Sequence, residues 1–140
     1  MQNLGVTLYR ALRMIPMVLI MGIIFFLSHQ SGDSLYVPPI PGFDKILHFG
    51  VYFVLGGAVI YGLYSGGTLR APLTICLITI VICTFYGVSD EFHQSFIPGR
   101  FVSFADLVTD FFGALAACCL WVLLSIRRKN SSKCWVHNRG

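Results

Sequence analysis

Length, composition and charge define the class of protein to which this chain belongs. Its 140 residues leave room for one domain, 1–140. Of these residues 56% are hydrophobic and 11% are charged, and the mean hydropathy is +0.75. Soluble domains carry roughly 25% charged residues, so a soluble fold is excluded. The net charge of +4 comes mostly from basic residues that flank apolar segments, which indicates membrane topology and no nucleic-acid partner.

Four apolar blocks follow one another along the chain, at 14–27, 46–64, 73–88 and 107–126. Each approaches the roughly 20 residues that a helix needs to cross hydrocarbon. Pro72 suits the first turn of the third helix, where its missing N–H costs nothing. We therefore expect an all-α polytopic membrane protein, an antiparallel bundle of four transmembrane helices. Its core is about 14–126, followed by a basic tail at 127–140.

The first block also has features of a signal peptide, because Arg10 and Arg13 precede an apolar stretch of suitable length. The segment that follows, 28–32 (SHQSG), is a poor small-x-small cleavage site. We therefore expect the block to be retained as a membrane helix.

The distribution of basic residues predicts the orientation. They precede the first block, lie in the 65–71 loop and follow the fourth block, whereas only Lys45 and Arg100 lie on the other side. The positive-inside rule then places both termini in the cytoplasm. All six acidic residues and three histidines fall on the outer side: Asp33, Asp44, Asp90, Glu91, Asp106, Asp110, His29, His48 and His93.

Helical spacing groups these polar residues. Asp44, His48 and Tyr52 are four residues apart, so they stack on one face of the second helix. In the third helix, residues 90, 93 and 94 share a face while Glu91 points elsewhere. The candidates for ligand binding are Asp44, Lys45, His48, Tyr52, Asp90, Glu91, His93, Gln94, Arg100 and Asp106.

A purely structural interpretation of these residues remains open. Asp44 can cap the second helix, and Ser103-x-x-Asp106 is similar to a capping box ahead of the fourth. The acids at 90 and 91 can pair with the bases at 45 and 100. His48 and Asp110 fit this interpretation least, because both lie about one turn inside a membrane segment. An ionisable group there is costly and usually faces the bundle interior with a partner.

Two kinds of chemistry are compatible with these side chains. In the first, His48 and His93 with Asp44, Asp90 or Glu91 bind a divalent metal, for which the ligand types suit zinc or manganese. Neither an HExxH motif nor a tight CxxC is present to support it.

In the second, a histidine–carboxylate pair performs acid–base chemistry while Arg100 and Lys45 hold an anionic group such as a lipid phosphate. The catalytic candidates are His48, Asp90 and His93.

Two motifs carry a resemblance to a known family. The run at 86–100 (YGVSDEFHQSFIPGR), with Asp106 six residues on, resembles the signature of the VanZ-like family. Asp44-Lys45-x-x-His48-Phe49-x-x-Tyr52 resembles its other motif, and the similarity in layout covers about 14–126. The matching residues are Asp44, Lys45, His48, Tyr52, Asp90, Glu91, His93, Gln94, Pro98, Gly99, Arg100 and Asp106.

The resemblance implies a bacterial integral membrane protein of the plasma membrane with about four helices. The name-giving member is linked to resistance to glycopeptide antibiotics, notably teicoplanin, but no mechanism carries over with the motifs. The leading hypothesis is an outer polar site that engages an anionic lipid, a lipid-linked cell-wall precursor or the glycopeptide bound to it. The alternatives are an intramembrane enzyme acting on a lipid-linked phosphate and a structural or assembly subunit without chemistry.

Overall fold

The computed structural model describes residues 2–32, 40–64 and 71–137, with side chains described only between residues 4 and 128. Within these ranges the chain forms four helices and no strand. The helices are α1 (Gln2–Ser28), α2 (Phe43–Leu63), α3 (Pro72–Gln94) and α4 (Phe104–His137). Each contains a segment long and apolar enough to cross a bilayer. The predicted all-α bundle of four transmembrane helices is confirmed.

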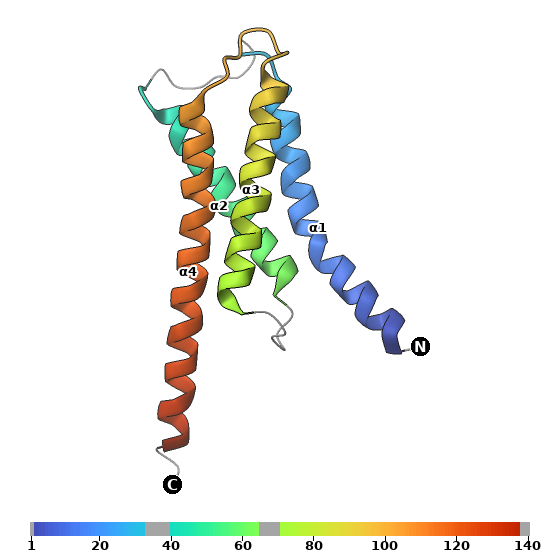
Figure 1. The fold of residues 1–140 in the computed structure, drawn as a ribbon, viewed down its shortest axis with the longest axis vertical. Helices are drawn as coiled ribbons and strands as arrows, with labels where there is room; N and C mark the ends of the chain where they lie inside the picture. Colours follow the sequence, from blue (N-terminus) through green and yellow to red (C-terminus); the bar gives the residue numbers. More distant parts are fainter. Residues whose placement is uncertain (1, 33–39, 65–70, 138–140) are drawn as a thin grey trace.

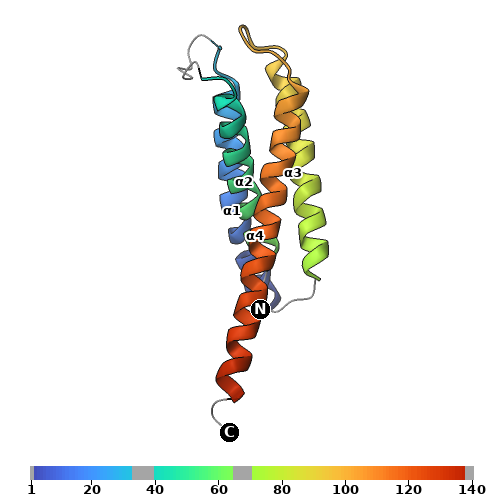
Figure 2. The same ribbon diagram turned by 90° about the vertical axis from the view of Figure 1, so that its left-hand side faces the viewer.

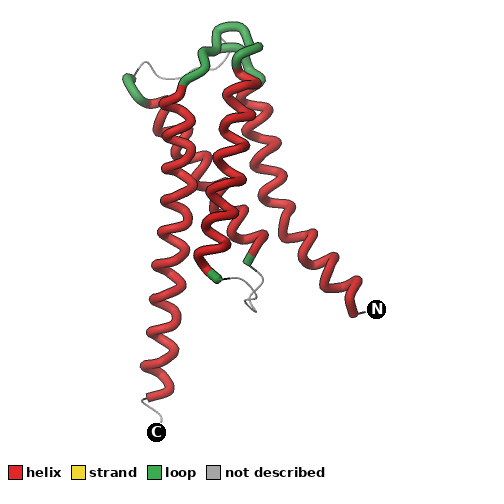
Figure 3. Tube along the Cα trace, in the orientation of Figure 1, coloured by secondary structure: helices red, strands yellow, loops and turns green. Residues whose placement is uncertain are grey.

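The helices run antiparallel, and their arrangement separates two chemically different ends. The start of α1 and the end of α4 lie at one end, whereas the end of α1, the start of α2 and the α3–α4 connection lie at the other (Figures 1 and 3). We call the latter the polar end. It comprises the last turn of α1, the first two turns of α2, the last two turns of α3, the 95–103 turn and the first two turns of α4. The connection between α2 and α3, with Arg70, falls at 65–70, outside the described residues.

The helices are longer than the apolar blocks that predicted them. The third block ends at 88, whereas α3 continues to Gln94 and includes the acid–histidine motif. The backbone of α4 continues to His137, so most of the basic segment 127–140 prolongs the fourth helix (Figure 2). Hydropathy locates the part of a helix that faces lipid, but backbone hydrogen bonds can continue beyond it. Pro72 lies in the first turn of α3, as predicted.

Helices α2 and α4 make the closest contact in the bundle. A Cβ atom on Gly113 would lie 2.5 Å from the Phe49 carbonyl oxygen, and one on Gly56 would lie 3.0 Å from the Ala117 Cβ. These small residues let the two backbones approach. By contrast, nothing lies within 4 Å of the Cβ position of Gly57, the next residue of α2. The α2–α4 contact positions the polar end, since both helices begin there.

Two buried apolar clusters hold the four helices together. The one nearer the polar end consists of Ile24, Tyr52, Leu55, Val59, Cys83 and Ala114. The one nearer the termini consists of Ile60, Ile75, Cys76, Ala117 and Cys118. Many large apolar side chains outside these clusters are exposed, which fits an exterior that contacts lipid acyl chains. Contact with the lipid bilayer is therefore consistent with the fold.

Candidate functional site

Four carboxylates from two helices, α3 and α4, are buried at the polar end. Asp90, Glu91, Asp106 and Asp110 each expose less than a tenth of their surface. At membrane depth such groups need partners, because hydrocarbon offers none. The contacts of these carboxylates therefore define what the polar end can do.

The most deeply buried carboxylate belongs to Asp110, which is 1% exposed. Its Oδ1 lies 3.0 Å from Nδ1 of His48, which joins α4 to α2. Gly87 of α3 makes room for it, because a Cβ there would come within 2.9 Å of Asp110 Oδ2. The expectation that His48 and Asp110 face the interior with a partner is confirmed. Asp110 was not among the ligand-binding candidates, although its depth in the membrane and its spacing of four from Asp106 could have included it.

Lys45 forms the ion pairs of the polar end. Its Nζ lies 2.7 Å from Asp44 Oδ2, pairs with Asp106 Oδ1 and lies 3.4 Å from the Ser103 hydroxyl. The structural interpretation of the sequence paired Asp90 and Glu91 with Lys45 and Arg100. Among the described residues neither pairing is formed, since Lys45 pairs with Asp44 and Asp106 and Arg100 donates to backbone carbonyls. Lys45 begins α2 opposite the start of α4, so the carboxylate nearest to it is the one in the first turn of α4.

The start of α4 is capped from another helix. The backbone N–H of Ser103 donates to Glu91 Oε2 at 2.8 Å. The capping box predicted from Ser103 and Asp106 is therefore not formed, because Asp106 is engaged by Lys45 and Glu91 takes its place. Nor does Asp44 cap α2, which follows Gly42 in the left-handed conformation and has no side-chain cap. Asp44 contributes a negative charge in the first turn, where the helix dipole favours it.

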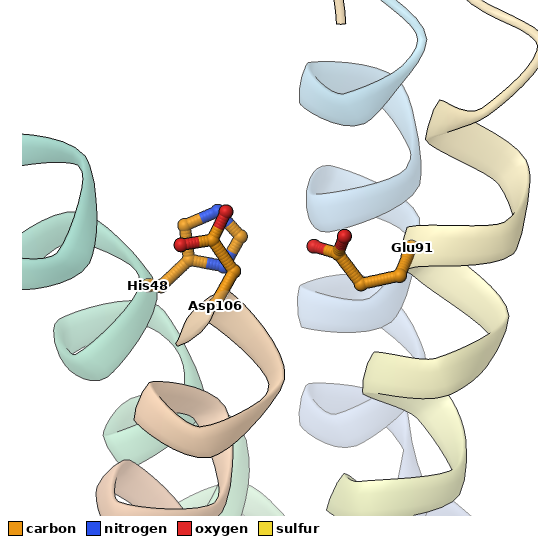
Figure 4. A group of neighbouring side chains, drawn as sticks. All are labelled: His48, Glu91 and Asp106. Atoms are coloured by element: carbon orange, nitrogen blue, oxygen red, sulfur yellow. The ribbon is translucent and has the colours of Figure 1, made fainter. Parts of the chain in front are cut away.

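One group of these side chains has the composition of a metal site. His48, Glu91 and Asp106 each offer one ligand atom, and these atoms all lie within 4.8 Å of one another. Figure 4 shows the three side chains converging from α2, α3 and α4. Both Glu91 and His93 were candidates from the sequence, which expected His93 to share a face with Asp90 and Glu91 to point elsewhere. In the structure Glu91 joins the group with His48, and His93 does not.

His93 faces α1 instead. Its Nε2 lies 3.3 Å from Nδ1 of His29, and its ring packs 4.7 Å from that of Phe25. Successive helical residues are rotated by about 100°, so residues 91 and 93 lie about 200° apart around α3. Only one of them can face α2 and α4, and the structure selects Glu91. The predicted metal set of His48 with His93 is therefore not brought together.

A cavity of about 260 Å³ opens beside this group, between α1, α2 and α3. The stacked face predicted for α2 is confirmed, since Asp44, His48 and Tyr52 all line the cavity. The Tyr52 hydroxyl is buried and has no hydrogen-bond partner within the described residues. The residues that line the cavity are Ile24, Leu27, Ser28, Asp44, Leu47, His48, Val51, Tyr52, Asp90, Gln94 and Arg100.

The α3 side of the cavity is held by hydrogen bonds. Gln94 Nε2 donates to Asp90 Oδ2 at 2.9 Å and to the Ser28 hydroxyl at 3.3 Å. Arg100 donates from Nε to the Gln30 carbonyl at 3.3 Å and from Nη2 to the Leu27 carbonyl at 3.2 Å. Ser28 was missed by the sequence analysis, because a serine at the end of an apolar block carries no distinguishing signal.

Comparison with known proteins gives a family match over nearly the whole bundle. The model of the family described as VanZ/LLP1 matches residues 7–125. Among curated proteins, Uncharacterized protein C11E3.10 of Schizosaccharomyces pombe is 35% identical over 91 residues. That match covers 64% of this chain and 53% of the yeast protein, so the chain spans about half the length of this relative. No solved structure matches.

Proposed function

The chain belongs to the VanZ/LLP1 family, and we propose that its polar end binds the phosphate of a membrane lipid or lipid-linked envelope precursor in the cavity beside Arg100. In this proposal the protein lies in the bacterial plasma membrane with both termini in the cytoplasm. The polar end then faces outward, where envelope precursors carry their headgroups.

The observation that carries the proposal is that Arg100 has no anionic partner among the described residues. This residue lines the cavity, and its recorded hydrogen bonds go to two neutral backbone carbonyls. No carboxylate among the described residues contacts it. A guanidinium has five N–H donors in a planar fork that matches a phosphate, so Arg100 retains both charge and donors for an anion. Lys45, the other cation at this end, is already engaged by Asp44 and Asp106.

The rest of the cavity suits an amphiphile. Ile24, Leu27, Leu47 and Val51 provide an apolar wall for a hydrocarbon chain. Asp90 provides a carboxylate that can accept hydrogen bonds from headgroup hydroxyls or amines. A small soluble anion would use the basic residue alone, whereas a phospholipid or polyprenyl phosphate uses the wall as well.

A lipid phosphate is also a ligand that this chain and its yeast relative could share, whereas a bacterial cell-wall precursor bound by a glycopeptide is not. The S. pombe protein is eukaryotic, and phosphate headgroups occur in every cell membrane. A contribution to teicoplanin-type resistance follows if the bound lipid is a wall precursor. Its test is glycopeptide susceptibility of a responsive bacterial host that carries the wild-type chain or the Arg100→Gln variant.

The direct test is lipid binding to the purified protein. We expect native mass spectrometry to show retention of phosphatidylglycerol or undecaprenyl phosphate, and comparison of the two distinguishes a bulk lipid from a wall-precursor carrier. Charge-assisted hydrogen bonds contribute about 1.5–3 kcal/mol, so Arg100→Gln should weaken retention roughly tenfold or more. Arg10→Gln removes an exposed cation at the opposite end and should change nothing. Equal retention by wild type and Arg100→Gln would refute the proposal.

A second candidate function is hydrolysis of a lipid-linked phosphate. His48 lines the cavity and is oriented by the buried Asp110, the arrangement of a general base held by a carboxylate. This candidate predicts phosphate release from polyprenyl diphosphate by the wild-type protein and loss of release in His48→Gln. No turnover across a panel of lipid phosphates would leave binding as the function.

A further inference from the structure

The group of His48, Glu91 and Asp106 joins three helices at a single point. One imidazole nitrogen and two carboxylate oxygens lie within 4.8 Å of one another there, from α2, α3 and α4 (Figure 4). We propose that these three side chains bind one divalent cation of the Zn²⁺ or Mn²⁺ class. This proposal does not rest on the proposed lipid phosphate, because Arg100 is not among the three ligands.

A buried carboxylate oxygen without a hydrogen-bond partner supports the cation site. Glu91 is 5% exposed, and while its Oε2 accepts from Ser103 N–H, its Oε1 has no hydrogen-bond partner in the described part of the chain. Figure 4 shows this carboxylate aimed at His48 and Asp106. Buried polar atoms are nearly always paired, and a carboxylate oxygen can be paired only by a donor or a cation. Cation binding would satisfy this oxygen.

The charge balance around the group favours a cation as well. Lys45 pairs with Asp44 and Asp106 and makes no recorded contact with Glu91. Carboxylates thus outnumber basic groups in a segment shielded from water, where unbalanced charge is costly. The ionisable groups facing one another are Asp44, Lys45 and His48 from α2, Asp90 and Glu91 from α3, Arg100 from the turn, and Asp106 and Asp110 from α4.

The contact between His48 and Asp110 suits a metal ligand. Its Nδ1 lies 3.0 Å from Asp110 Oδ1, so a proton on Nδ1 leaves the lone pair on Nε2. A carboxylate behind a histidine in this manner orients the ring and fixes its tautomer in metal sites. Asp110 therefore acts as a positioning residue. A bound cation would take the lone pair that a general base needs, so metal binding and the acid–base role of His48 exclude each other.

The ligand types define the class of cation. One imidazole with two carboxylates suits Zn²⁺ or Mn²⁺ better than soft thiophilic metals. Three protein ligands leave at least one coordination position open, as in catalytic zinc sites. Since His48 also lines the cavity, a ligand there would be next to the cation.

The test is metal binding by full-length protein purified in detergent with its affinity tag removed. After incubation with Zn²⁺ or Mn²⁺ and desalting, we expect about one equivalent per chain by mass spectrometry of the metal, the stoichiometry that a single group of ligands predicts. His48→Gln and Glu91→Gln should each lower the affinity at least tenfold, because both remove a direct ligand. Glu91→Gln keeps an amide oxygen for Ser103 N–H, so its loss of metal would not reflect loss of the cap.

His93→Gln is the matched control, since it changes a histidine two residues from Glu91 that faces α1 instead. It should bind as wild type does. Lys45→Gln should bind more tightly, because it removes a cation that shares Asp106, and a gain cannot arise from misfolding. The proposal is overturned if wild type binds no metal, if His48→Gln binds as well as wild type, or if His93→Gln is as deficient as His48→Gln.

Discussion

At the scale of single residues, the polar end shows how a membrane bundle accommodates an acid near its core. Asp110 is almost fully buried, and it is tolerated because His48 approaches one oxygen and Gly87 leaves space beside the other. Its Oδ2 has no partner in the described part of the chain. The pair therefore contributes to stability through one contact, and the free energy of that contact can be measured.

We predict a positive coupling between His48 and Asp110. Interhelical hydrogen bonds in membranes are worth about 0.6 kcal/mol on average and up to about 1.7 kcal/mol. A double-mutant cycle with His48→Ala and Asp110→Ala should give a coupling energy in this range. The measurement is the free energy of unfolding by SDS in mixed micelles. A coupling energy of zero within error would mean that the two side chains do not stabilise each other.

Membrane depth could be read from the sequence and identified some site residues, whereas helix rotation could not be read from it. The depth of His48 and Asp110 inside an apolar block showed that each needs a partner, and this needs no knowledge of the fold. The choice between Glu91 and His93 depends instead on how α3 is rotated about its axis. Rotation is determined by contacts with other helices, such as the close approach at Gly87. Spacing along one helix shows which residues share a face but not where that face points.

At the scale of elements, the α3–α4 connection depends on a cap supplied across the bundle. Glu91 accepts from the Ser103 N–H one residue ahead of α4. Loss of a helix cap costs about 0.5–2 kcal/mol, so Glu91→Ala should lower the free energy of unfolding by that amount. Glu91→Gln should recover most of it, since its amide oxygen can accept the same bond. SDS unfolding of the metal-free protein checks this, and equal stability of Glu91→Ala and wild type would contradict it.

The α2–α4 contact gives a second element-scale prediction. Gly113→Ala places a Cβ within 2.5 Å of the Phe49 carbonyl oxygen, so the helices must separate. Overpacking of this kind typically costs 1–3 kcal/mol, and we expect a loss of stability of about that size. Gly57→Ala is the control on α2, because its Cβ position is open. If both substitutions have the same effect on SDS unfolding, close packing at Gly113 is not what joins the two helices.

The number and order of the helices could be read from hydropathy, since each apolar block is long enough to span the bilayer. Their ends could not. The last two turns of α3 carry Asp90, Glu91 and His93, and a transfer scale counts these as leaving the membrane. Their partners are Gln94 of α3 itself for Asp90, Ser103 of the turn for Glu91 and His29 just after α1 for His93. The last two partners become known only when the helices are placed beside one another.

At the scale of the whole molecule, the bundle has a basic end and an acidic end. Arg10, Arg13, Arg127 and Arg128 lie at the end with the termini. Arg13 also joins two helices there, since its Nε donates to the Tyr61 carbonyl at 2.9 Å. The acids that the structure describes lie at the other end, where Glu91 and Asp106 approach each other. An asymmetry of this kind both orients the chain in the membrane and places the cavity on one side of it.

We predict that the polar end is outside the cell and both termini are inside. Positive residues resist translocation, so the end with more of them stays in the cytoplasm. A cysteine at Phe101, which is 87% exposed in the α3–α4 turn, should react with a membrane-impermeant maleimide in intact bacteria when the native cysteines are replaced. Fluorescent protein fused after Gly140 should fluoresce, whereas alkaline phosphatase at the same position should be inactive. Labelling of the Phe101→Cys variant only after permeabilisation would reverse the topology. The cavity, with the lipid-phosphate site proposed in it, would then lie at the cytoplasmic leaflet.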